Sequence, residues 1–201
     1  MLKNIIFDFG NVLVNLDEQA TMEALMAVLD PEKMADFFEM ALFPFEKGQI
    51  SEEAFFNRLQ RRSKKVQDGE YYFSAWNQMI LDFPENRMQM LRELRPNYRL
   101  FLMSNINITH LRYIKRMLQL HNQSPEFETL FDQVYLSFEC GMRKPELEFF
   151  QNILEKEQLI AEECLFIDDR IENIDAAIQL GINTHLHDPA QEIAVTIHSI
   201  L

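Results

Sequence analysis

The residues with the most evident chemical potential are acids placed directly after short apolar runs. Asp8 follows the apolar residues 5–7, and the pair Asp168 and Asp169 follows residues 165–167. If folding brings these three carboxylates together, they repel one another unless a cation lies between them. Mg²⁺ suits such a place because it binds carboxylate oxygens and completes its shell with water and substrate phosphate. The acids therefore predict a magnesium site.

Three further polar residues suit the same chemistry. Ser104 and Asn105 follow another apolar run, and Lys144 stands before a proline where a loop passes into an expected helix. A hydroxyl group and the N–H groups that begin a helix bind phosphate oxygens, and an ammonium group adds a positive charge. A free oxygen of Asp8 can then attack phosphorus and form an aspartyl-phosphate. The set predicts phosphoryl transfer, which depends on positioning and charge neutralisation.

A parallel β-sheet would bring these residues together. We expect strands at residues 5–7, 99–103, 133–136, 165–167 and 183–186. The first, second and fourth are nearly continuous apolar runs, which is typical of strands that are buried on both faces. Helical patterns lie between them, at residues 85–94, 108–120, 146–155 and 171–180. This alternation predicts a doubly wound α/β fold, whose ligands bind beyond the carboxyl ends of the strands.

One region carries only helical patterns. Between residues 17 and 83 we expect helices at 18–29, 31–42, 51–61 and 69–81. Aromatic residues are frequent here, and we interpret most of them as the core of a helical bundle. The chain is thus expected to form an α/β core from residues 1–16 and 84–201, with a helical cap of residues 17–83 inserted after the first strand.

Composition restricts the possible partners of the 201-residue chain. Its net charge of −13 would repel nucleic acid and anionic membranes, and its apolar runs are too short to span a bilayer. The two cysteines fit neither a zinc site nor a disulfide framework. We therefore expect a cytoplasmic protein that binds neither nucleic acid nor membrane. The sequence carries no signal for an oligomeric state.

Four segments together resemble the motifs of the haloacid dehalogenase superfamily. They are residues 5–12, 102–105, 141–146 and 166–169. The resemblance implies a Mg²⁺-dependent phosphatase with a C1-type cap and Asp8 as the nucleophile. It further implies that Ser104, Asn105 and Lys144 bind the phosphate. Within the superfamily the motifs resemble those of bacterial sugar-phosphate phosphatases, which implies a small phosphorylated metabolite such as glucose 1-phosphate.

The resemblance also implies the metal ligands. They are Asp8, the carbonyl of Gly10, Asp168 and Asp169, with Asp169 binding directly and Asp168 either directly or through water. Asn173 is expected to orient the last motif.

Gly10 departs from the usual pattern of these phosphatases, which place a second aspartate there as general acid and base. A positioned general acid typically contributes about 10²- to 10⁴-fold in rate. Asp17, near the junction of core and cap, is our candidate for its replacement. Two alternatives stay open: a 2-haloacid dehalogenase that needs no metal, and a catalytically weak protein that binds a phosphorylated metabolite or another protein.

Overall fold

The computed structural model describes residues 1–121, 127 and 129–201. It contains one parallel sheet of five strands in the order β3-β2-β1-β4-β5. The strands are β1 (Asn4–Phe7), β2 (Arg99–Ser104), β3 (Gln133–Leu136), β4 (Cys164–Asp168) and β5 (Asn183–Leu186). The expected strands and the doubly wound α/β fold are confirmed. Because β1 is central, Asp8 emerges between the ends of β2 and β4.

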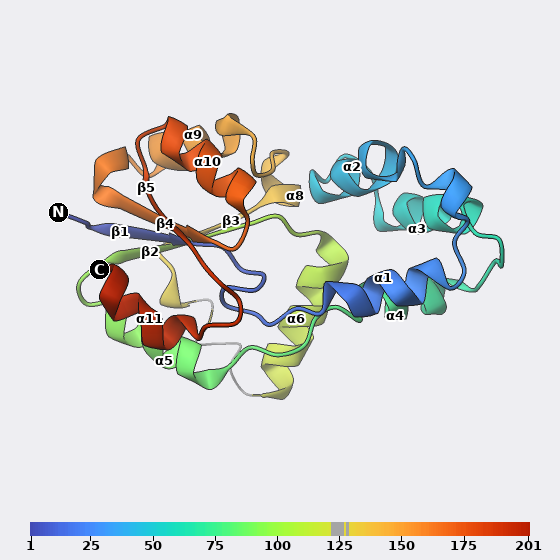
Figure 1. Ribbon diagram of the computed structural model, residues 1–201, viewed down its shortest axis with the longest axis horizontal. Helices are drawn as coiled ribbons and strands as arrows, with labels where there is room; N and C mark the ends of the chain where they lie inside the picture. Colours follow the sequence, from blue (N-terminus) through green and yellow to red (C-terminus); the bar gives the residue numbers. More distant parts are fainter. Residues whose placement is uncertain (122–126, 128) are drawn as a thin grey trace.

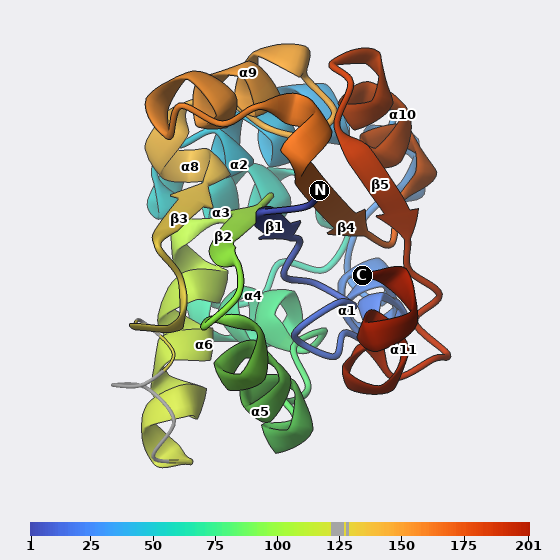
Figure 2. The same ribbon diagram turned by 90° about the vertical axis from the view of Figure 1, so that its left-hand side faces the viewer.

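Helices cover both faces of the sheet (Figures 1 and 2). One face carries α9 (Leu147–Lys156) and α10 (Ile171–Gln179), and the other carries α5 (Glu85–Leu94), α6 (Ile108–Leu120) and α11 (Ile193–Ile200). Side chains alternate between these faces along β1. Ile5 and Phe7 pack towards α5 and α11, and Ile6 packs towards α9 and α10. Burial on both faces explains why this strand is continuously apolar.

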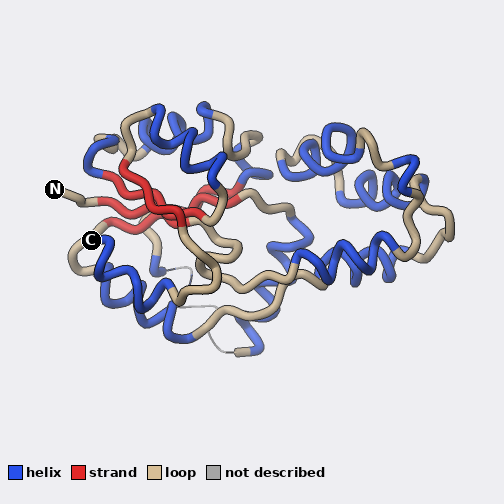
Figure 3. Tube along the Cα trace, viewed as in Figure 1, coloured by secondary structure: helices blue, strands red, loops and turns tan. Residues whose placement is uncertain are grey.

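The segment from residue 17 to residue 83 stands beside the sheet and consists of helices and loops (Figure 3). Its helices are α1 (Glu18–Met26), α2 (Phe43–Glu46), α3 (Glu52–Arg61) and α4 (Gly69–Asn77), with short 3₁₀ and π turns at Pro31–Lys33 and Phe38–Leu42. They enclose an apolar cluster of their own, which contains Phe45, Phe55, Tyr72 and Trp76. The expected aromatic core is present, although Phe38 and Phe73 are exposed. We use the name cap for residues 17–83, whose bounds stay a prediction.

One expected cap helix, at residues 31–42, is wrong. The expected helix is broken after Lys33, where the N–H of Phe37 donates to the carbonyl of Met34 at 3.0 Å rather than to that of Lys33. The guanidinium of Arg62, the C-cap of α3, donates to the carbonyl of Lys33 at 3.1 Å. A side chain of another segment thus occupies a carbonyl that a continuous helix would use.

The two linkers between core and cap pair with each other as short antiparallel segments. The N–H of Asn15 donates to the carbonyl of Asp82 at 2.9 Å, and the N–H of Leu81 donates back to Asn15 at 3.0 Å. Asp17 continues the pairing through its N–H, which lies 2.7 Å from the carbonyl of Met79. We call residues 15–17 and 79–82 the hinge. Among the described residues, no helix is both long and apolar enough to cross a membrane.

Candidate active site

A buried ammonium group joins two strand ends. Lys144 Nζ lies 2.6 Å from Oδ1 of Asp8 and 2.7 Å from Oδ2 of Asp168. Lys144 is 1% exposed, Asp8 is 8% exposed and Asp168 is fully buried. The predicted nucleophile, the predicted phosphate-binding lysine and one predicted metal ligand therefore meet at the carboxyl edge of the sheet, as expected for an open α/β fold.

Asp168 is held by donors of the protein on both of its oxygens. The Arg170 N–H donates to Oδ1 at 2.9 Å, and Asn173 Nδ2 lies 2.9 Å from Oδ1 and 3.0 Å from Oδ2. With Lys144 on Oδ2, little of this carboxylate remains for a ligand. The prediction that Asn173 orients the last motif is confirmed.

Asn105 fixes the main chain of Lys144. Its Nδ2 donates to the Lys144 carbonyl, its Oδ1 accepts from the Lys144 N–H, and both bonds measure 2.8 Å. These bonds leave the lysine side chain free to reach between the two aspartates. The predicted contact of Asn105 with substrate stays a prediction, because its amide is engaged here. Asn107 is the residue that caps α6.

Asp169 lies beside this cluster and is only half-buried. Its Oδ2 accepts a hydrogen bond of 3.1 Å from Asn11, whose own Oδ1 accepts from the N–H of Leu16 in the hinge. Asn11 has a positive φ of 56°, a conformation that asparagine tolerates better than most residues. A hollow of about 360 Å³, also lined by Glu18, opens next to Asn11 and Asp169. Asp169 is thus oriented and reachable from solvent.

The donor set fits a divalent cation. Asp8, Asp168 and Asp169 each offer an oxygen, and these oxygens lie within 4.8 Å of one another. When all three are ionised, the single ammonium group of Lys144 leaves two negative charges uncompensated. Hard oxygen donors with this excess charge suit Mg²⁺.

The ionisation of the cluster follows from its burial. Burial raises the pKa of Asp8 to about 7, Lys144 opposes this rise, and the charges of Asp168 and Asp169 add to it. Burial lowers the pKa of Lys144, but the two carboxylates outweigh burial and the net shift is upward. Lys144 therefore remains charged, and a further cation would favour the ionised form of Asp8.

Ser104 and Gly10 lie at the expected places. Ser104 ends β2 and is buried. Gly10 lies in the turn after Asp8 and forms an isolated bridge with Val14. A Cβ atom at position 10 would come within 2.7 Å of the Leu16 Cδ1 atom. A hinge leucine therefore fills the space into which an aspartate at this position would extend.

The side chain of Asp17 bonds to its own helix rather than to this cluster. It is exposed, and its Oδ1 accepts the N–H of Ala20 as the N-cap of α1. Its proposed role as the replacement acid would require the side chain to leave this cap.

Two residues at the edge of the site had no assigned role in the sequence. Arg143 precedes Lys144, and its Nε donates to Oε2 of Glu46 in the cap at 2.9 Å. Arg143 could have been found from the sequence, because it lies in the third motif-like segment, residues 141–146. No sequence feature marked Glu46 as part of the site.

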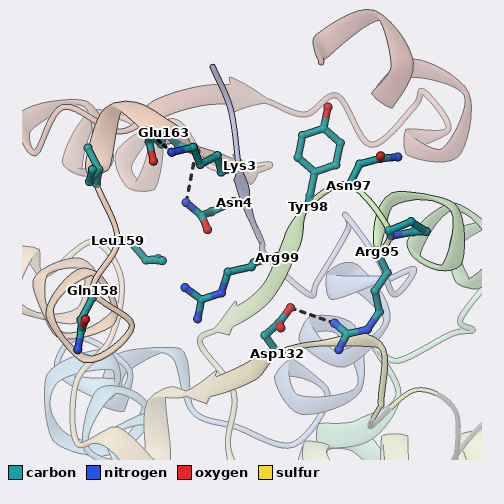
Figure 4. Close-up of a pocket in the computed structure, with 12 residues that line it drawn as sticks. Lys3, Asn4, Arg95, Asn97, Tyr98, Arg99, Asp132, Gln158, Leu159 and Glu163 are labelled. Atoms are coloured by element: carbon teal, nitrogen blue, oxygen red, sulfur yellow. Dashed lines mark hydrogen bonds and ion pairs between the residues drawn. The ribbon is translucent and has the colours of Figure 1, made fainter.

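A larger cavity lies away from this site. It measures about 580 Å³ and is lined by residues at the opposite, amino-terminal edge of the strands (Figure 4). Its basic groups are already paired: Lys3 with Glu163, Arg95 with Asp132 and Arg99 with Glu157. Because those pairs satisfy its charges, we place the chemistry at Asp8.

The fold and the site define an α/β protein with an acidic, metal-suited centre beside a helical cap. The model of the haloacid dehalogenase-like hydrolase family matches residues 2–181. The chain belongs to this family, as its motifs predicted.

Three relatives illustrate the similarity. The chain is 28% identical to D-ribitol-5-phosphate phosphatase of Bacteroides thetaiotaomicron, over 99% of the chain and 100% of the relative. It is 30% identical to a sesquiterpene phosphatase of Aspergillus oryzae, over 92% and 90%. A crystal structure of a HAD family enzyme of B. thetaiotaomicron, in complex with magnesium and inorganic phosphate, superimposes with a TM-score of 0.83 at 29% identity, covering 96% of this chain and 97% of that one.

Proposed function

We propose that this protein is a Mg²⁺-dependent phosphatase that hydrolyses a small phosphorylated metabolite through an aspartyl-phosphate at Asp8. The observation that carries the proposal is the buried Lys144, whose ammonium group lies 2.6 Å from Asp8 and 2.7 Å from Asp168, with Asp169 close by. The names of two sequence relatives, D-ribitol-5-phosphate phosphatase and a sesquiterpene phosphatase, support it. The complex of a similar structure with magnesium and phosphate supports the choice of cofactor.

The proposed reaction has two steps. An oxygen of Asp8 attacks phosphorus, the phosphorus–oxygen ester bond breaks, and the leaving oxygen takes up a proton. Water then attacks the aspartyl-phosphate, which releases phosphate and restores Asp8. Lys144 stays charged throughout and neutralises the phosphoryl oxygens, with Ser104 and Asn105 as further phosphate ligands.

Mg²⁺ would be held by Asp8, the carbonyl of Gly10 and Asp169, and when bound it supplies further neutralisation of phosphoryl charge. We place Asp168 in an indirect role, through water, because Lys144, Asn173 and the N–H of Arg170 already engage its oxygens. Among the described residues, Oδ2 of Asp169 accepts from Asn11, and its other oxygen has no such hydrogen-bond partner.

The substrate class we favour is a sugar phosphate or sugar-alcohol phosphate. The motifs resemble those of sugar-phosphate phosphatases, and one relative is named for ribitol 5-phosphate. Ribitol 5-phosphate and glucose 1-phosphate differ in their leaving groups. An anomeric oxygen, as in glucose 1-phosphate, leaves more readily than a primary alkoxide and needs less help from a general acid.

Asp17 is the proposed source of that help, since Gly10 cannot supply it. Freed from its N-cap, Asp17 would move with the hinge on which it lies. If Asp17→Asn leaves kcat and the pH–rate profile unchanged, another acid or none serves the leaving group.

The test is phosphate release from a panel that includes ribitol 5-phosphate and glucose 1-phosphate, with and without EDTA. Turnover that needs both the metal and Asp8 supports the proposal. Metal-independent release of halide from a 2-haloacid would contradict it in favour of a dehalogenase. Tight binding of phosphorylated metabolites without turnover would contradict it in favour of a binding protein.

Metal binding has a second readout that does not depend on turnover. Mg²⁺ at about 100 times its Kd should stabilise the protein by about 2.7 kcal/mol. Asp169→Asn should lose most of this stabilisation, measured as the rise in Tm on adding MgCl₂. An equal rise in both proteins would remove Asp169 from the ligand set.

A further inference from the structure

Besides the hinge, the contacts between the described residues of cap and core include two that lie on different sides of the cap (Figure 1). On the hinge side, α3 and α4 meet α6, where Glu52 accepts a hydrogen bond of 2.8 Å from Thr109 and the Trp76 ring stacks on His110. On the other side, α2 approaches α8 (Ser137–Cys140) and the loop that carries Lys144. The second contact joins the cap to the phosphate-binding loop rather than to a remote surface.

Two consecutive cap residues form ion pairs with the residues that flank Lys144 and Pro145. Glu46 Oε2 lies 2.9 Å from Arg143 Nε, and both side chains are 15% exposed. Lys47 Nζ lies 2.5 Å from Glu146 Oε1. The order of charges is opposite in the two segments, acid then base in the cap and base then acid in the loop, so the alignment is specific.

Packing at the same contact requires close approach. The Arg143 guanidinium lies 4.1 Å from the centre of the Phe43 ring, a cation–π distance. Gly48 follows at a positive φ of 65°, and a Cβ atom there would come within 2.2 Å of the Phe138 carbonyl oxygen. A side chain at position 48 would therefore push the cap away from α8, besides straining its own backbone.

Lys144 itself does not need this contact, because Asn105 of the core holds its main chain from both sides. The loop can therefore release the cap while the lysine stays between Asp8 and Asp168. The hinge pairing lies on the other side of the cap and can remain in place.

From these contacts we infer that the pairs Glu46–Arg143 and Lys47–Glu146 form a closure latch, which holds the cap over the active site next to Lys144 and releases it by separating α2 from α8. The inference rests on the proposed function, since the site that the latch closes is the phosphatase site. The four residues are positioning residues: they act on substrates that fill the closed space and leave the phosphoryl-transfer machinery intact.

The experiment compares Glu46→Gln and Gly48→Ala with Arg112→Gln, which removes an ion pair on the hinge side of the cap. Each protein is assayed with the best sugar phosphate of the panel and with acetyl phosphate, a substrate too small to need the cap. The two latch variants should raise KM for the sugar phosphate about tenfold and change acetyl phosphate turnover by less than about threefold. The Arg112→Gln control should change neither.

Charge reversal provides a test that is insensitive to folding defects. Lys47→Glu alone places two acids opposite each other and should raise KM, and the double variant Lys47→Glu/Glu146→Lys should restore KM to within about threefold of the wild-type value. A double variant no better than Lys47→Glu would overturn the latch, as would latch variants that behave like Arg112→Gln.

Small-angle X-ray scattering tests the latch without turnover. In the presence of MgCl₂ and inorganic phosphate, Gly48→Ala should have a larger radius of gyration than the wild type and Arg112→Gln. An unchanged radius in Gly48→Ala would overturn the latch even if the protein is a phosphatase. An enlarged radius in a protein without phosphatase activity would support the latch and reject the proposed function, so the two failures are distinguishable.

Discussion

The catalytic cluster and the closure latch both hold charge that is at least partly withdrawn from solvent, but they balance it differently. In the cluster one ammonium group, of Lys144, serves Asp8 and Asp168, and a third carboxylate lies nearby. In the latch each base has one acid, as in the pair of Arg143 and Glu46. Excess buried charge is costly unless a ligand compensates it, whereas in one-to-one pairs each charge is already compensated by a protein group.

Burial raises the pKa of one acid in each place, but the neighbouring charges act differently: Asp168 and Asp169 add to the rise at Asp8, whereas Arg143 opposes the rise at Glu46. Burial raises the pKa of Asp8 to about 7 in spite of Lys144. Burial also raises the pKa of Glu46, with Arg143 opposing the rise. A buried acid therefore marks a ligand site here only where its neighbours are further acids.

Removing the nucleophile should have the largest effect. Asp8→Asn should lower kcat by on the order of 10⁴-fold or more, because the attacking oxygen is lost and the other groups cannot replace it. Phosphate release under saturating substrate measures this. The control is Asp68→Asn, which keeps the N-cap of α4 since asparagine caps helices equally well, and its kcat should stay at the wild-type value.

Removing the shared cation should be more costly than breaking the latch. Lys144→Met leaves Asp8 and Asp168 without their ammonium partner and should reduce the free energy of unfolding by about 3–5 kcal/mol. Urea denaturation at pH 8 with EDTA measures the loss. Arg143→Met serves as the comparison and should lose less, because Glu46 retains some contact with water. Equal losses would contradict the distinction between the two clusters.

The hinge-side contact should lose stability in acid. Burial lowers the pKa of His110 to about 4, and its hydrogen bond to the Trp76 carbonyl opposes this. Between this value and the ordinary value of 6.5, the unfolded chain binds more protons than the folded protein, so stability falls as the pH falls.

His110 should account for a loss of about 2 kcal/mol between pH 7 and pH 5. Urea denaturation across this range should show a smaller loss in His110→Gln than in the wild type. A pH dependence identical in both proteins would exclude His110 as its source.

The exposed ion pair on the hinge side should contribute least. Glu52 and Arg112 pair at the surface, where side-chain exposures are 29% and 55%. Such pairs typically contribute about 0.2–1 kcal/mol, so Arg112→Gln should change the free energy of unfolding by less than about 1 kcal/mol. A larger loss would show that the two cap–core contacts do not differ as proposed. Thermal denaturation of Arg112→Gln and the wild type at low and high salt measures this contribution, which should become smaller as the salt concentration rises.

Much of the fold and the site could be predicted from the sequence, because local patterns encode them. Strands such as β1 and β4 are continuous apolar runs, and the acids at their ends must share an edge once the strands are parallel. Asp8, Lys144, Asp168 and Asp169 were therefore predicted together and are found together. Family membership followed from the same segments.

The failures of prediction lie mainly in the cap, where tertiary contacts override local pattern. The helix expected at residues 31–42 is interrupted after Lys33, whose carbonyl accepts a hydrogen bond from Arg62 of a different segment. Helical periodicity carries no information about such donors.

The sequence by itself determined the parallel sheet, the edge at which the acids meet and the presence of a helical insertion, because hydrophobic periodicity and strand-end residues act locally. Only the tertiary structure decided that Lys144 is shared by two carboxylates, that Leu16 fills the space beside Gly10 and that Glu46 pairs with Arg143, 97 residues away. The physical reason is that contacts between a helical insertion and its core depend on how whole helices pack, which no local spacing records.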